Sequence, residues 1–379
     1  MCKSLFENCF LERIDRVFSS FIARKTTTEA DFRINKVANW NIQTGSKRTM
    51  LDLATLFQAL PKVPSLRNAK EVLSAAPIPG FPQNRIARDV DGQPVMLFKA
   101  DPQASYPPAV VLENLAIYHN RMCHIRSTSR QIDKGIFSSI SCTSPDKTVQ
   151  RYFLDVMAMI LAEQGQETNA FDVTRVVTTL VELFRALSRP PRESVQGLWA
   201  ELYFAVTARD PIKAFEAWHE YPEALYDFTS GSQSIEVKSA SYGVREHHFS
   251  LEQLRVPSGC EVLIASILVE TSEVGMSLTE LLKEVESKLS SRPDLLLRIH
   301  DTVAKTLGST WRSSLETKFD RQLARSSLLF FDPRVVPSVN PVLPRGVSNV
   351  RFVSNLSSVK PVSVDNYRES GSLFSASLR

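Results

Sequence analysis

A glutamate and a lysine two positions apart, Glu236 and Lys238, are the residues of this sequence best placed to do chemistry. They lie in Ser234–Ser239, a run that alternates polar and apolar side chains and therefore predicts a strand. Because side chains alternate between the two faces of a strand, Glu236 and Lys238 point to the same face. Asp227 lies one short turn upstream, and Gly231 in that turn predicts an antiparallel hairpin. Two carboxylates and an amine then converge, a set that suits a hard divalent cation and an activated water.

The same E-x-K spacing occurs twice more, in Glu286–Lys288 and Glu316–Lys318. The first lies within Leu278–Leu289, whose apolar residues recur at helical intervals, so it is interpreted as a solvated helix face. The second has no acidic residue upstream on a predicted strand. The alternative interpretation of Glu236 and Lys238 is an ordinary ion pair on an exposed sheet face. The aspartate at hairpin distance favours the chemical interpretation.

Glu201 is the one charged residue in Gly197–Val206, an apolar segment that predicts a helix with Ser194 as its N-cap. A lone carboxylate among apolar residues is costly to bury without a partner. Two interpretations follow: Glu201 lies at the helix edge in water, or it faces the metal site.

The order of these elements resembles the core of the PD-(D/E)XK, or restriction-endonuclease-like, superfamily. That order is a helix with a glutamate, a strand with an aspartate, a strand with E-x-K, and an apolar strand over Glu261–Val269. More narrowly, about residues 75–356 resemble a bacterial family of PD-(D/E)XK motif proteins encoded near phage-defence and restriction genes. The matching phrases are Gly197–Leu202, Tyr226–Phe228, Ile235–Ser239, His248–Leu254 and Pro344–Val350.

The resemblance implies roles for individual residues. Asp227 and Glu236 would ligate Mg²⁺, with Mn²⁺ as an alternative ion, and Glu201 would complete the metal shell directly or through water. Lys238 would orient or deprotonate the attacking water and steady the phosphate. Gln253 falls where some members place a polar residue that helps to position the lysine or the substrate.

The chemistry of phosphodiester hydrolysis agrees with these roles, because it needs a nucleophilic water, neutralised phosphate charge and help for the leaving oxygen. A lysine beside the metal can stabilise the transition-state charge as a point cation. The sequence departs from the family pattern at one position, where Tyr226 replaces the proline that names the motif. Many members lack that proline, so the departure changes little.

We expect an α/β protein with a restriction-endonuclease-like core, in which helices flank a central mixed sheet, and a β-rich domain before it. The predicted division is a helical N-terminal segment over 1–74, a β-rich domain with two helices over 75–190, a nuclease-like domain over 191–356, and a flexible serine-rich tail over 357–379. The clearest helical patterns are Met50–Ala59, 148–163, 171–188, 277–289 and 293–307.

The chain has 379 residues, of which 43% are hydrophobic and 23% charged, as in an ordinary globular protein. A net charge of only +4 permits nucleic-acid binding through local patches without demanding it. Candidate phosphate contacts are Arg209, Lys213, Arg245 and Arg255, although a solvated surface cation is the commoner role for each.

Several other classes are disfavoured. The five cysteines show no paired spacing, which argues against a disulfide framework or a zinc site, and Cys123 is interpreted as core packing. No Walker-type glycine loop is present, so any ATP-driven step would need a partner protein. No stretch approaches the roughly 18 apolar residues of a membrane span, and charges interrupt the N-terminal apolar residues. We therefore expect a cytoplasmic protein that does not enter a membrane.

Two functions of different classes remain. The first is a Mg²⁺-dependent DNA endonuclease of a bacterial phage-defence or restriction system, with a homodimer as one way to cut both strands. The second is a non-catalytic DNA-binding or scaffolding subunit that works with ATPase, helicase or methyltransferase partners. The convergence of Asp227, Glu236 and Lys238 favours the endonuclease, because a fold kept only for DNA binding does not need two carboxylates and a lysine at one place.

Overall fold

The computed structural model describes residues 51–63, 72–126, 132–164, 170–219, 224–241, 243–339, 345–367 and 372–378. Most of the helical segment expected over 1–74 lies outside these residues. The described part contains α3 (Leu53–Ala59), where the Asp52 side chain caps the helix by accepting the Thr55 N–H. The helix predicted over Met50–Ala59 is therefore confirmed.

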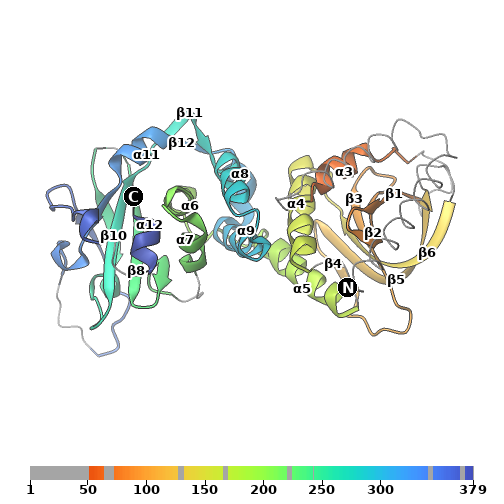
Figure 1. Ribbon diagram of the computed structural model, residues 1–379, viewed down its shortest axis with the longest axis horizontal. Helices are drawn as coiled ribbons and strands as arrows, with labels where there is room; N and C mark the ends of the chain where they lie inside the picture. Colours follow the sequence, from red (N-terminus) through yellow and green to blue (C-terminus); the bar gives the residue numbers. More distant parts are fainter. Residues whose placement is uncertain are drawn as a thin grey trace, which may run out of the picture.

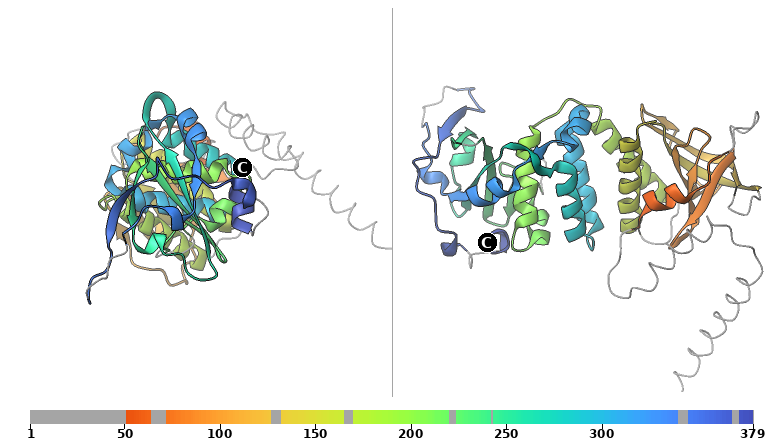
Figure 2. Two further views of the ribbon diagram at one scale, coloured as in Figure 1. Left: turned by 90° about the vertical axis from the view of Figure 1, so that its left-hand side faces the viewer. Right: turned by 90° about the horizontal axis from the view of Figure 1, so that it is seen from above.

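Two lobes lie along the long axis of the molecule, with a layer of helices between them (Figure 1). Figure 2 shows the same arrangement from above, with the strands of the N-terminal lobe at one end and the sheet of the C-terminal lobe at the other. The described residues thus form a mixed α/β protein, as the sequence predicted.

The N-terminal lobe is a sheet that closes on itself. Its strands are β1 (Val72–Ile78), β2 (Phe81–Arg88), β3 (Pro94–Lys99), β4 (Val110–Val111), β5 (Leu115–Arg126) and β6 (Ile132–Cys142). The order is β1-β2-β3-β6-β5-β4, and a parallel pairing of β1 with β5 joins the ends of a five-stranded ring. At the turn between β2 and β3, Gly92 has a φ of 78° and the Asp89 carboxylate accepts two backbone N–H groups.

Four long helices form the layer between the lobes: α4 (Lys147–Gln164), α5 (Ala170–Ala186), α8 (Leu278–Lys288) and α9 (Pro293–Leu307). Helix α9 packs against both α4 and α5. Helix α5 buries an apolar face, and α8 begins with a capping box between Ser277 and Glu280. The buried residues on that face of α5 include Val173, Val176, Val177, Leu180, Val181 and Phe184. One hydrophobic core runs from the closed sheet through this layer into the C-terminal lobe. All four helices confirm the sequence pattern.

The C-terminal lobe holds a four-stranded sheet in the order β13-β10-β8-β7. Its strands are β7 (Phe228–Ser230), β8 (Gln233–Ala240), β10 (Glu261–Leu268) and β13 (Leu329–Phe331). Strands β8 and β10 are parallel, while both outer pairings are antiparallel. Helices α6 (Val195–Thr207) and α7 (Pro211–Ala217) cover one face, and α11 (Arg321–Ser327) packs on β10.

Two small sheets complete this lobe. Strand β9 (Glu246–Ser250) pairs with β14 (Arg351–Asn355), and β11 (Thr271–Ser277) pairs with β12 (Lys318–Phe319). The helix α10 (Trp311–Leu315) lies between α9 and β12 in the chain, and its Trp311 ring packs 5.3 Å from that of Tyr152 on α4.

The expectation of a flexible tail over 357–379 is wrong for the last described residues. Residues 372–378 pack onto the C-terminal lobe through helix α12 (Ser372–Ser377), which contacts α7, β7 and β8. Phe374 is fully buried, and its backbone N–H donates to the Gln233 side chain. The sequence did not predict this helix, because its six residues are too few to show a helical period and half of them are serines.

Cys123 and Cys142 are buried free thiols, and Cys123 packs in a second core on the other face of the closed sheet, so the expectation of core packing is confirmed. In the part of the chain that the structure describes, every helix is too short or too polar to span a membrane.

Phe374→Ala should lower the free energy of unfolding by about 3–5 kcal/mol, the usual cost of truncating a buried aromatic side chain. Urea-induced unfolding of the full-length chain measures this change. Val274→Ala, at a side chain 96% exposed on β11, is the control and should have little effect. An unchanged unfolding free energy in Phe374→Ala would mean that α12 is not part of the cooperative fold.

Candidate active site

Helix α6 carries Glu201 into the interior of the C-terminal lobe. The helix begins as predicted, with the Ser194 hydroxyl accepting the Gly197 N–H, and all its residues over Leu198–Thr207 are buried. Glu201 is only 5% exposed, and the Trp218 indole donates to its Oε2 at 2.9 Å. The interpretation of Glu201 as a solvated residue at the helix edge is therefore wrong.

The β7–β8 hairpin holds Asp227 beside Glu236. The two strands pair in antiparallel register with Phe228 opposite Ile235, so the predicted hairpin is confirmed. The Asp227 backbone N–H donates to Glu236 Oε2 at 3.3 Å, and the Val237 N–H donates to Asp227 Oδ2 at 2.7 Å. Each carboxylate is thus fixed by a backbone group of the neighbouring strand segment.

Lys238 and Gln253 meet at one oxygen of Glu236. Lys238 Nζ lies 2.6 Å from Glu236 Oε1, and Gln253 Nε2 donates to the same oxygen at 2.5 Å. Gln253 follows β9, and its own side-chain oxygen accepts the Ser250 N–H at 3.0 Å. The Gln253 amide therefore orients the Glu236 carboxylate, and this carboxylate holds the Lys238 amine.

His219 is a site residue that the sequence analysis missed. Its Nε2 lies 3.0 Å from Glu201 Oε2, and its backbone N–H donates to the Asp227 carbonyl at 2.9 Å. Burial lowers the pKa of His219, but the hydrogen bond to Glu201 and the charges of Glu201, Glu193 and Glu236 together outweigh this effect, and the pKa is raised. A single histidine after the short helix α7 gives no periodic or spacing signal, so only the three-dimensional contact with Glu201 identifies it.

The site holds more negative charge than its lysine neutralises. Burial raises the pKa of Asp227 well above its ordinary value, and the charges of Glu236 and Glu201 raise it further. Burial also raises the pKa of Glu236, although Lys238 partly offsets this. Desolvation lowers the pKa of Lys238, but the attraction of the carboxylates outweighs it and the pKa is raised. A bound cation would relieve this excess of negative charge.

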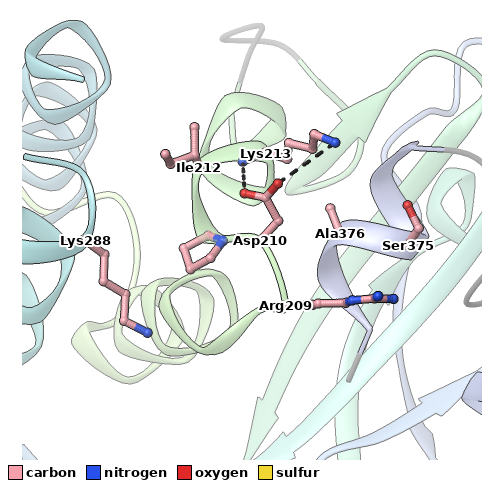
Figure 3. Close-up of a pocket in the computed structure, with 8 residues that line it drawn as sticks. Arg209, Asp210, Ile212, Lys213, Lys288, Ser375 and Ala376 are labelled. Carbon is pink, nitrogen blue, oxygen red and sulfur yellow. Dashed lines mark hydrogen bonds and ion pairs between the residues drawn. The ribbon is translucent and has the colours of Figure 1, made fainter. Parts of the chain in front are cut away.

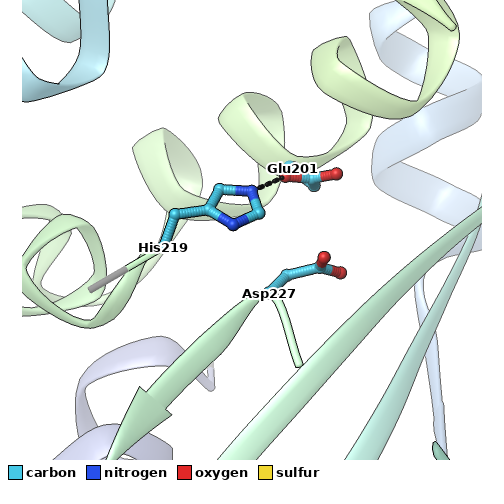
Figure 4. A group of neighbouring side chains, drawn as sticks. All are labelled: Glu201, His219 and Asp227. Atoms are coloured by element: carbon cyan, nitrogen blue, oxygen red, sulfur yellow. Dashed lines mark hydrogen bonds and ion pairs between the residues drawn. The ribbon is translucent and has the colours of Figure 1, made fainter. Parts of the chain in front are cut away.

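Glu201, His219 and Asp227 offer ligand atoms that all lie within 4.8 Å of one another. Figure 4 shows the three side chains, from α6, the segment after α7 and the start of β7, pointing toward one another. Carboxylate oxygens suit Mg²⁺ and Mn²⁺, so the donor set and the local charge fit a divalent cation. Glu236, which we expected as a metal ligand, is not in this group, and its oxygens contact Lys238, Gln253 and the Asp227 N–H.

The four candidate phosphate contacts do not gather at this site. Arg209 and Lys213 line a cavity of about 720 Å³ between the start of α7 and helix α12 (Figure 3). Arg245 donates to Ser266 and to the Ser327 carbonyl, which gives it a structural role. Arg255 is exposed beyond β9. None of the four has a described contact with Glu201, Asp227 or Glu236, and Lys213 pairs with Asp210 instead.

A family model described as "Putative PD-(D/E)XK family member, (DUF4420)" matches residues 65–357. No curated protein and no solved structure matches the chain.

Asp227→Asn should raise the free energy of unfolding of the metal-free protein at pH 8, because the amide replaces a carboxylate whose pKa is raised by burial in the folded chain. The folded chain keeps the Asp227 proton above the pH at which the unfolded chain releases it, so its stability falls as the pH rises through this window. The advantage of Asp227→Asn should therefore shrink toward pH 4.

Urea unfolding in a chelator at pH 4.5, 6 and 8 measures the difference, with the exposed Asp91→Asn as control. An advantage that grows on acidification would show that the Asp227 carboxylate is stabilised, not strained, in the metal-free fold.

Proposed function

The chain belongs to this PD-(D/E)XK family, and from that premise we propose that it is a metal-dependent DNA endonuclease that hydrolyses phosphodiester bonds. The observation that carries the proposal is the single network in which Glu201, Asp227, Glu236, Lys238 and Gln253 converge. The chain order α6–β7–β8–β10 supports a restriction-endonuclease-like core for the C-terminal lobe.

The carboxylates of Glu201, Asp227 and Glu236 form the acidic site at which Mg²⁺ or Mn²⁺ would bind. The bound ion would supply an activated water and would neutralise charge on the phosphate. All three carboxylates are positioned before any ion arrives, because Trp218 and the hairpin backbone already hold them. Such preorganisation avoids a cost of rearrangement during the reaction.

Lys238 would act on the phosphate as a point charge. Its ion pair with Glu236 keeps the amine protonated and aims it from the strand face that Asp227 also reaches. Gln253 donates to the same Glu236 oxygen and fixes the carboxylate, so the lysine has one preferred position. A positioned cation contributes most where negative charge develops, which is at the transition state.

We place this activity in a bacterial phage-defence or restriction system, where ATPase, helicase or methyltransferase proteins would be partners. The resemblance of residues 75–356 to proteins encoded beside such genes supports this placement. One hydrolytic site per chain cuts one strand, so cleavage of a duplex would require a homodimer or two successive nicks.

Lys238→Ala should reduce DNA cleavage by about 10²–10³-fold while leaving DNA binding largely unchanged, because the lysine serves the transition state more than the ground state. Nicking and linearisation of supercoiled plasmid with Mg²⁺ or Mn²⁺ measure cleavage, and fluorescence anisotropy with a labelled duplex measures binding.

Lys318→Ala is the matched control, since Lys318 ends another E-x-K triplet but is exposed on β12 and donates to a backbone carbonyl. Equal cleavage by wild type and Lys238→Ala would contradict the proposal. DNA binding without cleavage by the wild type, with either ion and with modified DNA, would favour the non-catalytic binding subunit instead.

A further inference from the structure

We infer that His219 is a nitrogen ligand of the metal ion, which is then held by Glu201, His219 and Asp227, while Glu236 serves to anchor Lys238. The inference rests on the proposed metal-dependent function. It changes the ligand set that the sequence alone suggests, because it replaces a carboxylate oxygen with an imidazole nitrogen.

The first observation is the placement of the ligand atoms. One atom each from Glu201, His219 and Asp227 lies within 4.8 Å of the other two. Ligands at 2.0–2.4 Å from a common ion lie roughly 3–4.5 Å apart, so small rotations of these side chains suffice to bring them onto one ion. The Glu201 side chain is 7% exposed and that of His219 is 28% exposed, so the group lies at the edge of the interior, where an ion can enter.

The second observation is the backbone of His219, which has a φ of 44°. A residue other than glycine rarely adopts this left-handed conformation, and strain of this kind is concentrated at functional sites. Two contacts with the hairpin maintain it: the His219 N–H donates to the Asp227 carbonyl, and the preceding Trp218 forms a β-bridge with Phe228. The imidazole is thereby directed toward the Glu201 carboxylate (Figure 4).

The third observation is that Glu236 is already engaged. Its Oε1 contacts both the Lys238 amine at 2.6 Å and the Gln253 amide at 2.5 Å, and its Oε2 accepts the Asp227 N–H. An ion at Glu236 would compete with Lys238 for the same oxygen. Among the described residues, the partners of the Glu201 carboxylate are the neutral Trp218 indole and His219, which is itself the inferred nitrogen ligand, so neither is a lysine that would compete with the ion. The geometry therefore assigns metal binding to Glu201 and the anchoring of Lys238 to Glu236.

This ligand set predicts a preference for Mn²⁺ over Mg²⁺. Mg²⁺ demands oxygen ligands and retains its waters, whereas an imidazole nitrogen binds first-row transition ions better. The competing interpretation is that His219 and Glu201 form only a buried ion pair, in which case the metal shell would contain oxygen alone.

The test is electron spin-echo envelope modulation of the full-length protein loaded with Mn²⁺, which detects a nitrogen bonded to the ion without requiring activity. We expect ¹⁴N modulation in the wild type and in Glu236→Gln, and its loss in His219→Gln. His219→Gln should also weaken Mn²⁺ binding, measured by titration of the free-ion signal, on the order of ten- to a hundredfold. The same variant should reduce the Mn²⁺-over-Mg²⁺ preference.

His248→Gln is the matched control, because His248 is an exposed histidine on β9, and it should keep both the modulation and the affinity. Mn²⁺ binding to the wild type without ¹⁴N modulation would overturn the role of His219, whatever the variants do, and would leave the nuclease proposal standing. Modulation that persists in His219→Gln would also overturn it. Failure of the wild type to bind Mn²⁺ or Mg²⁺ at all would instead overturn the metal-dependent function on which the inference rests.

Discussion

The electrostatic repulsion among the buried carboxylates of Glu201, Asp227 and Glu236 is the constraint that the rest of the C-terminal lobe has to accommodate. Burying carboxylates is costly unless each one is hydrogen-bonded and the local charge is balanced. The hydrogen bonds come from an indole, an amide and the hairpin backbone, whereas among the described residues Lys238 is the one lysine or arginine paired with these carboxylates. The proposed metal-dependent chemistry would account for a cluster of buried carboxylates that stability alone does not favour.

The packing around these residues explains how the fold tolerates the energetic cost of burying three carboxylates. Strand β8, which carries Glu236 and Lys238, lies between β7 and β10, and helix α6 is enclosed on every side. Packing of the Phe204 ring against Phe228 on β7 and Phe330 on β13 attaches α6 to the sheet. The contribution of this aromatic packing to stability can offset a strained polar cluster, since a buried aromatic side chain contributes several kcal/mol.

Local pattern was sufficient to predict the parts of the site that lie close together in sequence. The alternation in β8, the turn before it and the cap of α6 each depend on a few neighbouring residues, and the structure confirms each one. The placement of His219 depends on a backbone conformation set by contacts with Asp227 and Phe228, which no local pattern encodes. The closure of the N-terminal sheet was beyond prediction for the same reason, because it requires β1 to pair with β5 across the intervening strands. Helix α12 was missed because its stability comes from burial of Phe374 and not from its own composition.

The connection between the two lobes is held in place by contacts with the end of α9. Residues 188–192, where the sequence suggested a boundary, are attached to the end of α9: Ser309 donates to the Arg189 carbonyl, and Arg192 donates to that of Thr306. Gly308 approaches so closely that an added Cβ would lie 2.2 Å from the Arg189 oxygen. A connection held in this way, within a core shared by both lobes, resists independent movement of the two lobes.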